Sequence, residues 1–157
     1  MRLAPIVLAG LVACGKGKEN QTPDDFAAMQ TRGEHVMGVD QYTSAHVFED
    51  LPDGGRVVLD DNTADSTAIA TIRAHMRDIA VAFRAGDFSK PFEVHAQTVP
   101  GTDVMRARSA AITYEPIDRV WGAQVRIKST DPVAIAAIHQ FLAFQREAHQ
   151  APEHEHQ

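Results

Sequence analysis

The chain has 157 residues, of which 44% are hydrophobic and 23% are charged, and this composition is typical of a single soluble globular domain. Its formal net charge is -6 and it has no run of lysine or arginine, which argues against nucleic-acid binding and against electrostatic attachment to anionic lipid. The single cysteine excludes an intramolecular disulfide and a thiolate metal cluster.

A short apolar segment lies at the start of the chain. Residues 3–12 are apolar and follow one positive charge, at Arg2. This run has about half of the roughly 20 residues that a transmembrane helix needs. Its length and its position match the apolar core of a secretory signal peptide.

The apolar segment ends in Leu11-Val12-Ala13-Cys14, which resembles the bacterial lipobox. In that family the cysteine thiol is alkylated with diacylglycerol, and a peptidase cuts before the cysteine. The resemblance covers residues 1–14. It implies a signal peptide over residues 1–13, lipidation of Cys14, and a domain anchored to a membrane of the cell envelope, facing the periplasm or the exterior. An ordinary secretory signal, or an apolar terminal helix of a cytosolic protein, are the alternatives.

The rest of the chain divides into three parts. The polar composition after Cys14 predicts a flexible tether over residues 14–33, with a short helical turn over residues 26–30. A single domain is expected over residues 34–150. The last residues, 151–157, form a polar, histidine-containing tail that we expect to be disordered.

Two β-hairpins, each followed by a helix, are predicted within the domain. The first hairpin covers residues 46–59 and turns at Pro52-Asp53-Gly54-Gly55. Its helix covers residues 66–85, with apolar residues three or four positions apart. The second hairpin covers residues 112–128, and its helix begins after Asp131, with Pro132 in the first turn.

The two halves resemble each other, because Val57 and Leu59 align with Val125 and Ile127 in the last strand of each hairpin. We therefore expect an α+β fold of two layers, in which a four-stranded antiparallel sheet carries two helices on one face. The alignment also suggests a duplicated strand-strand-helix unit. A connection over residues 87–110, with a short helix over 102–109, joins the halves.

Eight histidines stand out in this composition. His46 shares a strand face with Phe48, and that face is predicted to be core. His75 borders the apolar stripe of the first helix, and His149 follows Gln145 on the apolar stripe of the second. Polar residues at buried positions break the local pattern, and such breaks tend to mark functional sites.

A buried imidazole needs partners, and convergence of several imidazoles on a metal ion supplies them. Neutral imidazole suits copper and zinc, and a thioether, from Met37, Met76 or Met105, would favour Cu(I). We hypothesise a copper or zinc site whose ligands are His46, His75, His95, Met105 and His149. In the alternative, each buried histidine is simply hydrogen-bonded to the backbone or to Gln145.

The tail residues His154 and His156 form a separate group, which binds divalent metal weakly or is only a solvated tail.

Two stretches of the domain look similar to an uncharacterised group of small exported bacterial proteins. They are Met37-Gly38-Val39-Asp40-Gln41 with Thr43-x-x-His46, and the segment from Ala-Ile-His139 to Gln145. The resemblance spans roughly residues 36–149 and implies no particular activity. Members of that group would carry a second histidine where this chain has Ala45, which weakens a site built on two adjacent strand histidines.

Three functions therefore compete. The first is a lipid-anchored envelope domain that binds a transition metal. The second is a structural or protein-interaction lipoprotein without metal, which docks a partner envelope protein, with Trp121 as a candidate anchor. The third is a hydrolase that uses a histidine and a carboxylate. It has the least support, because the sequence shows no nucleophile elbow and no phosphate-binding loop.

Overall fold

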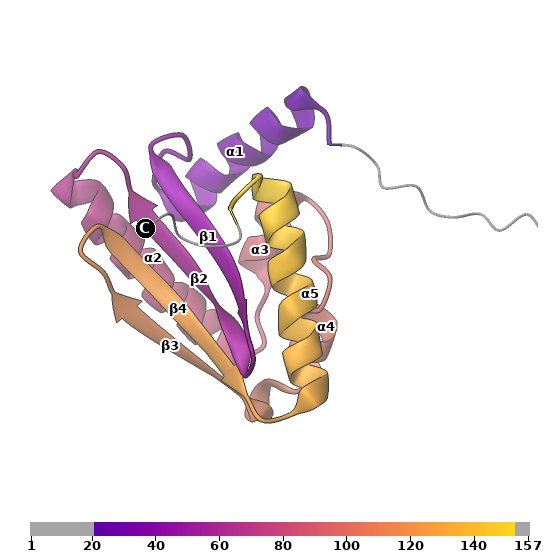
Figure 1. Ribbon diagram of the computed structural model, residues 1–157. Helices are drawn as coiled ribbons and strands as arrows, with labels where there is room; N and C mark the ends of the chain where they lie inside the picture. Colours follow the sequence, from indigo (N-terminus) through magenta and orange to yellow (C-terminus); the bar gives the residue numbers. More distant parts are fainter. Residues whose placement is uncertain (1–20, 153–157) are drawn as a thin grey trace, which may run out of the picture.

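Four strands form one antiparallel sheet in the order β1-β2-β4-β3, which confirms the expected α+β class. The structure is a computed structural model that describes residues 21–152 (Figure 1). The expected signal peptide, Cys14, His154 and His156 lie outside the described residues. In chain order, the elements are α1 (Pro23–Met37), β1 (Ser44–Leu51), β2 (Gly54–Asp61), α2 (Ser66–Arg84), α3 (Ser89–His95), α4 (Thr102–Ala107), a 3-10 turn (Ser109–Ala111), β3 (Ile112–Asp118), β4 (Gly122–Ser129) and α5 (Pro132–His149).

The inner strands β2 and β4 join the two hairpins. Val57 of β2 lies directly opposite Val125 of β4, and these are the two valines that the sequence alignment made equivalent. Each hairpin therefore meets the other at the same position of its last strand. The strand-strand-helix order is repeated around this pair.

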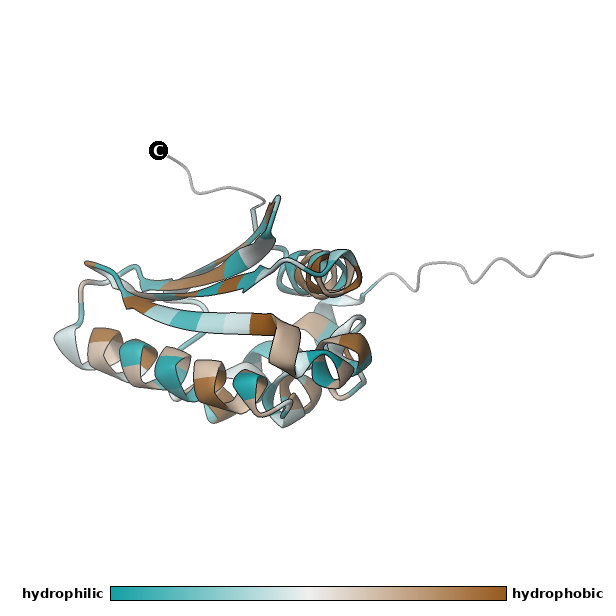
Figure 2. Cartoon of the chain, turned by 90° about the horizontal axis from the view of Figure 1, so that it is seen from below, coloured by the Kyte–Doolittle hydropathy of each residue, from teal (hydrophilic) through white to brown (hydrophobic). Residues whose placement is uncertain are grey.

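Each long helix packs mainly against the hairpin that it does not follow in the chain. The first, α2, packs mainly against β3 and β4, whereas α5 packs mainly against β1 and β2. Both contribute to one hydrophobic core on a single face of the sheet, as expected. Figure 1 shows α5 beside the edge strand β1, and Figure 2 shows a long helix running along one face of the sheet.

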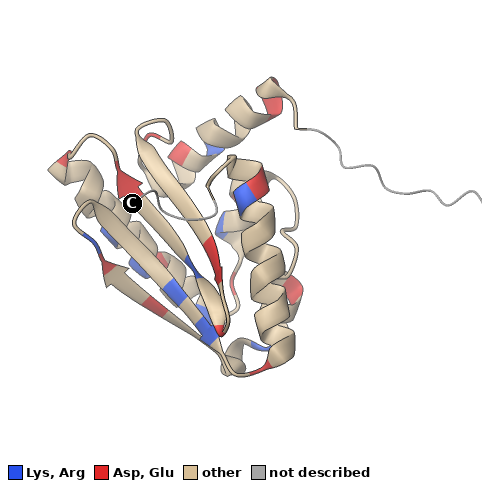
Figure 3. Ribbon diagram, viewed as in Figure 1, with Lys and Arg blue, Asp and Glu red and all other residues tan. Residues whose placement is uncertain are grey.

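The other face of the sheet is polar along β4, whereas Val47 and Val58 form a buried apolar pair on the β1–β2 part of it. Gln124, Arg126 and Lys128 alternate along β4 with buried residues, as the sequence predicted. Arg126 pairs with Asp53, and Lys128 with Glu115. Figure 3 marks basic positions along the central strand β4 and acidic positions on the edge strands β1 and β3.

The boundaries of α2 and α5 follow from local chemistry. Asp65 caps α2 by accepting hydrogen bonds from the backbone N–H groups of Thr67 and Ala68, and Asp131 caps α5 in the same way. Pro132 occupies the first turn of α5, as predicted. After α2 the chain reverses at Gly86, whose φ of 76° is costly for other residues.

The prediction of a flexible tether is wrong for the residues that form α1. Residues 23–33 were assigned to a flexible segment, but they form most of a 15-residue helix. A capping box between Thr22 and Asp25 starts the helix, and Met29 is buried. The side chain of Arg32 donates a hydrogen bond of 2.8 Å to the carbonyl of Val94, which holds α1 against α3. The sequence of α1 has little apolar periodicity, so it predicted only the short helical turn over residues 26–30 and not the full helix.

The connection between the halves contains two short helices. One of them, α4, was expected, although it is shorter than predicted. The other, α3, was not, and residues 89–95 were placed in a linker. The fold therefore has five α-helices within residues 21–152 rather than the two that the fold prediction named.

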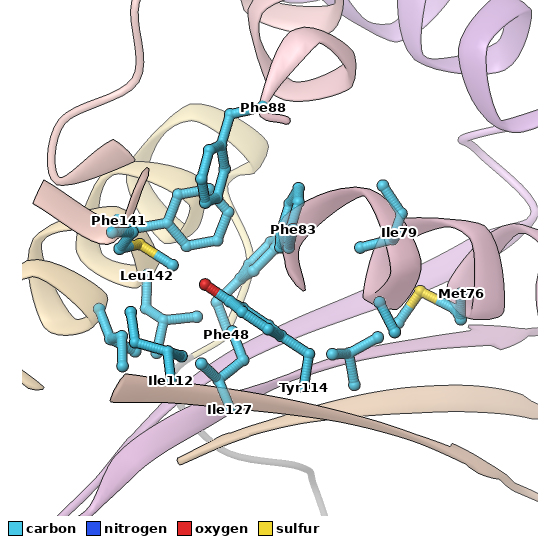
Figure 4. Close-up of a cluster of buried hydrophobic side chains, with 14 of the residues drawn as sticks. Phe48, Met76, Ile79, Phe83, Phe88, Ile112, Tyr114, Ile127, Phe141 and Leu142 are labelled. Atoms are coloured by element: carbon cyan, nitrogen blue, oxygen red, sulfur yellow. The ribbon is translucent and has the colours of Figure 1, made fainter. Parts of the chain in front are cut away.

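The core contains one unsatisfied hydroxyl. Tyr114 of β3 is fully buried beside Phe83, and its Oη atom has no hydrogen-bond partner among the described residues (Figure 4). Burial also raises the pKa of this phenol well above its usual range. An unpaired buried hydroxyl costs free energy, so this position limits the stability of the fold.

We expect Tyr114→Phe to raise the free energy of unfolding by about 1 kcal/mol, because it removes the unpaired oxygen and keeps the ring. Urea denaturation measures this change. Tyr42→Phe is the matched control, since the side chain of Tyr42 is exposed and should leave stability unchanged. A loss of stability in Tyr114→Phe would mean that the hydroxyl has a partner.

Candidate functional site

Four of the five predicted ligands line one pocket. His46 comes from β1, His75 from α2, His95 from α3 and His149 from α5. The pocket has a volume of about 80 Å³, which leaves room for only a few water-sized groups. Residues far apart in the sequence thus converge where a small ligand or an ion fits.

Three of the rings are in direct contact, with His149 in the middle. Its ring centroid lies 4.8 Å from that of His46, in a stacked arrangement, and 5.1 Å from that of His95, edge to face. Phe48 closes the group, 5.4 Å from His149. The prediction that His46 and Phe48 share a strand face is confirmed, because both line the pocket.

The imidazoles are neutral near pH 7. Burial, with a smaller contribution from the neighbouring His75, lowers the pKa of His46 to about 4. Burial also lowers the pKa of His75 to about 4, with a smaller contribution from Lys90. For His149, burial and the two neighbouring imidazoles hold the pKa well below its usual value. Each neutral ring carries one nitrogen lone pair that can bind a metal ion or accept a proton.

His95 is held by a specific partner. Its Nε2 atom donates a hydrogen bond of 2.8 Å to the Oε1 atom of Gln145, and both residues are buried. Burial lowers the pKa of His95, while the bond to Gln145 opposes that shift. Because Nε2 carries the proton in this bond, Nδ1 is the nitrogen with the free lone pair.

His46 has an unsatisfied atom. Its Nε2 is buried and has no hydrogen-bond partner within the described part of the chain. Buried polar atoms are almost always paired in folded proteins, so an unpaired imidazole nitrogen in a pocket suits a bound group. This atom is the strongest individual indication of a ligand.

The prediction of Met105 as a metal ligand is wrong. It is fully buried in the hydrophobic core and does not line the pocket. Two other methionines do line it, Met37 at the end of α1 and Met76 on α2. The sequence offered all three methionines as thioether donors. Only the packing of α1 and α2 shows that Met37 and Met76, and not Met105, line the pocket.

The remaining wall residues divide into expected and unexpected ones. Gln145 was noted as a polar residue in an apolar stripe, and it does face the pocket. Lys90 on α3 was missed, because the residues around it show no periodicity that would have placed them in a helix.

His139 has a different role. Its Nε2 atom lies 3.0 Å from the carbonyl oxygen of Leu51 and 2.9 Å from that of Gly54. It thereby ties α5 to the β1–β2 turn and lies outside the pocket.

The ring nitrogens do not yet surround a common point. Within residues 21–152, no three histidine, cysteine, aspartate or glutamate side chains are arranged so that they could hold a metal ion. The rings of His46 and His149 are stacked, with an interplanar angle of 24°. Metal binding in this pocket therefore requires some of its side chains to move.

Comparison with known proteins yields no assignment: no protein-family model, no curated protein and no solved structure matches this chain significantly. The site must therefore be interpreted from its own geometry.

The buried imidazoles make stability depend on pH. The unfolded chain binds more protons than the folded chain between pH 6.5 and about 4, so the free energy of unfolding falls as the pH drops through this window. For His46 alone, the loss is roughly 3 kcal/mol at the acidic end. Urea denaturation at several pH values measures the slope.

The variant His46→Asn should reduce this slope, since asparagine does not titrate. His35→Asn is the control, because His35 is exposed on α1 and its replacement should leave the slope unchanged. Equal slopes in the parent and in His46→Asn would show that His46 is protonated as readily in the folded chain as in the unfolded one.

Proposed function

We propose that this protein binds a transition-metal ion, copper or zinc, through the pocket histidines, in a domain held in the cell envelope by a lipid on Cys14. The observation that carries the metal proposal is the convergence of His46, His75, His95 and His149 on one pocket from four different elements. Depressed pKa values support it, because a metal ligand must be unprotonated.

Binding would work by reorientation of the rings. His95 is fixed by Gln145, whereas His46 has no partner on Nε2. Rotation of His46 and His149 out of their stack would direct their lone pairs towards the pocket. A bond to the metal ion would then give Nε2 of His46 the partner that it lacks. The affinity for the ion must exceed the cost of unstacking the rings.

Elemental analysis after equilibration with copper or zinc tests the proposal. The parent protein is the full chain with Cys14→Ala, His154→Ala and His156→Ala, so that neither the thiol nor the tail binds metal. We expect about one ion per chain, and close to none after His46→Asn or His149→Asn. His35→Asn should retain the full content. A parent chain that binds no metal would overturn the proposal.

The envelope location has separate support in the lipobox-like Leu11-Val12-Ala13-Cys14. No helix within residues 21–152 is long and apolar enough to span a bilayer. We expect mass spectrometry of the protein from bacterial membranes to find a chain that starts at Cys14 and carries diacylglycerol. Cys14→Ser should move it to the soluble fraction, and an intact Met1 with a free thiol would contradict the anchor.

A second function is favoured by one surface feature. Three large apolar side chains of the β3–β4 hairpin are exposed: Ile117 by 37%, Val120 by 74% and Trp121 by 51%. A cluster of this kind suits contact with a partner envelope protein. Trp121 also lines a second depression together with His46 and His149, so a partner docked there would lie beside two of the pocket histidines.

A further inference from the structure

Two thioethers lie in the walls of the histidine pocket. Met76 follows His75 on α2 and is almost fully buried, while Met37 ends α1 and is half-buried. A polarizable sulfur is a soft ligand and binds soft metal ions in preference to hard ones. The pocket therefore offers neutral imidazoles and thioethers together.

The charge of the pocket is the second constraint. None of the described residues that line it is an aspartate or glutamate, and its one ionic side chain, Lys90, is positive. Arg32 adds a positive charge near His95 and lowers its pKa. Near His75, the negative charge of Asp78 raises the pKa, but by less than the positive charge of Lys90 lowers it. No anionic ligand is thus available to neutralise a bound cation.

This constraint discriminates strongly between cation charges. The cost of transferring an ion from water into an apolar interior grows with the square of its charge, so a divalent ion costs roughly four times as much as a monovalent one. Structural zinc sites usually offset this cost with thiolates or carboxylates and four ligands. A monovalent ion needs less compensation and is stable with two or three neutral donors.

We propose that the pocket selects Cu(I) over Zn(II) and Cu(II), with Met37 and Met76 as thioether donors beside the histidines. This inference rests on the proposed metal-binding function and specifies its ion. It places the α1 helix in the site, because Met37 reaches the pocket from its last turn.

The test compares two metals on the same protein. The parent is again the full chain with Cys14→Ala, His154→Ala and His156→Ala. Cu(I) is titrated without oxygen against a chromophoric Cu(I) chelator, and Zn(II) against a chromophoric zinc chelator. We expect the Cu(I) affinity to exceed the Zn(II) affinity by at least roughly 1000-fold.

Methionine variants then test the ligands. We expect Met37→Leu with Met76→Leu to lower the Cu(I) affinity by about 10-fold or more and to change the Zn(II) affinity little. Met105→Leu is the matched control, since Met105 is a core residue outside the pocket, and it should change neither. Leucine replaces methionine with little change of volume, so folding should persist, and circular dichroism checks it. X-ray absorption of the Cu(I) form should show a sulfur neighbour.

The outcomes separate this inference from the function it rests on. Zinc binding as tight as Cu(I) binding, or Cu(I) affinity that is the same with and without Met37 and Met76, would overturn the Cu(I) assignment and leave metal binding intact. Absence of binding by both ions would overturn both.

Discussion

The pairing of β2 with β4 is the interaction on which the rest of the structure depends. It joins two hairpins into one sheet, and each hairpin then receives the helix of the other half. A hairpin needs a packed helix or further strands to be stable, and here each hairpin obtains its helix mainly from the other half, so the core forms only when both halves are present. The pocket inherits this dependence, because His46 and His75 come from the first half and His149 comes from the second.

The pocket combines features that are costly for stability. Its imidazoles are buried without charge, one ring nitrogen is unpaired, and two rings are stacked rather than directed to a common point. Leaving a buried polar atom without a partner costs about 1–3 kcal/mol. Such a cost is usual at functional sites, where the local arrangement serves a ligand rather than the fold. A bound ion would supply the missing partner and would hold the rings in one orientation.

Gln145 illustrates how the surrounding structure prepares one ligand. It lies one turn before His149 on α5, in a stripe whose earlier residues are apolar, and its amide oxygen accepts a hydrogen bond from His95 Nε2. This bond selects the tautomer of His95 and therefore which nitrogen can bind. A polar residue in an apolar stripe was visible in the sequence, but its partner was not, because the two residues are 50 positions apart.

The sequence by itself determined the local structure. Turn residues and alternation predicted both hairpins, and apolar periodicity with Asp65 and Asp131 predicted α2 and α5. These features depend on near neighbours in the chain, so they can be recognised without the fold. The helix α1 was predicted only as a short turn, because its stability comes from a capping box and from contacts with α3 rather than from an apolar stripe.

The tertiary structure decided the composition of the site. Polar residues at apolar positions marked His46, His75 and His149 as unusual, but nothing local distinguished Met105 from Met37 and Met76. Which methionine lines the pocket depends on how α1, α2 and α4 pack against the rest of the fold. That packing arises from long-range apolar contacts, and a linear pattern of residues does not contain the directions in which side chains point once those contacts form.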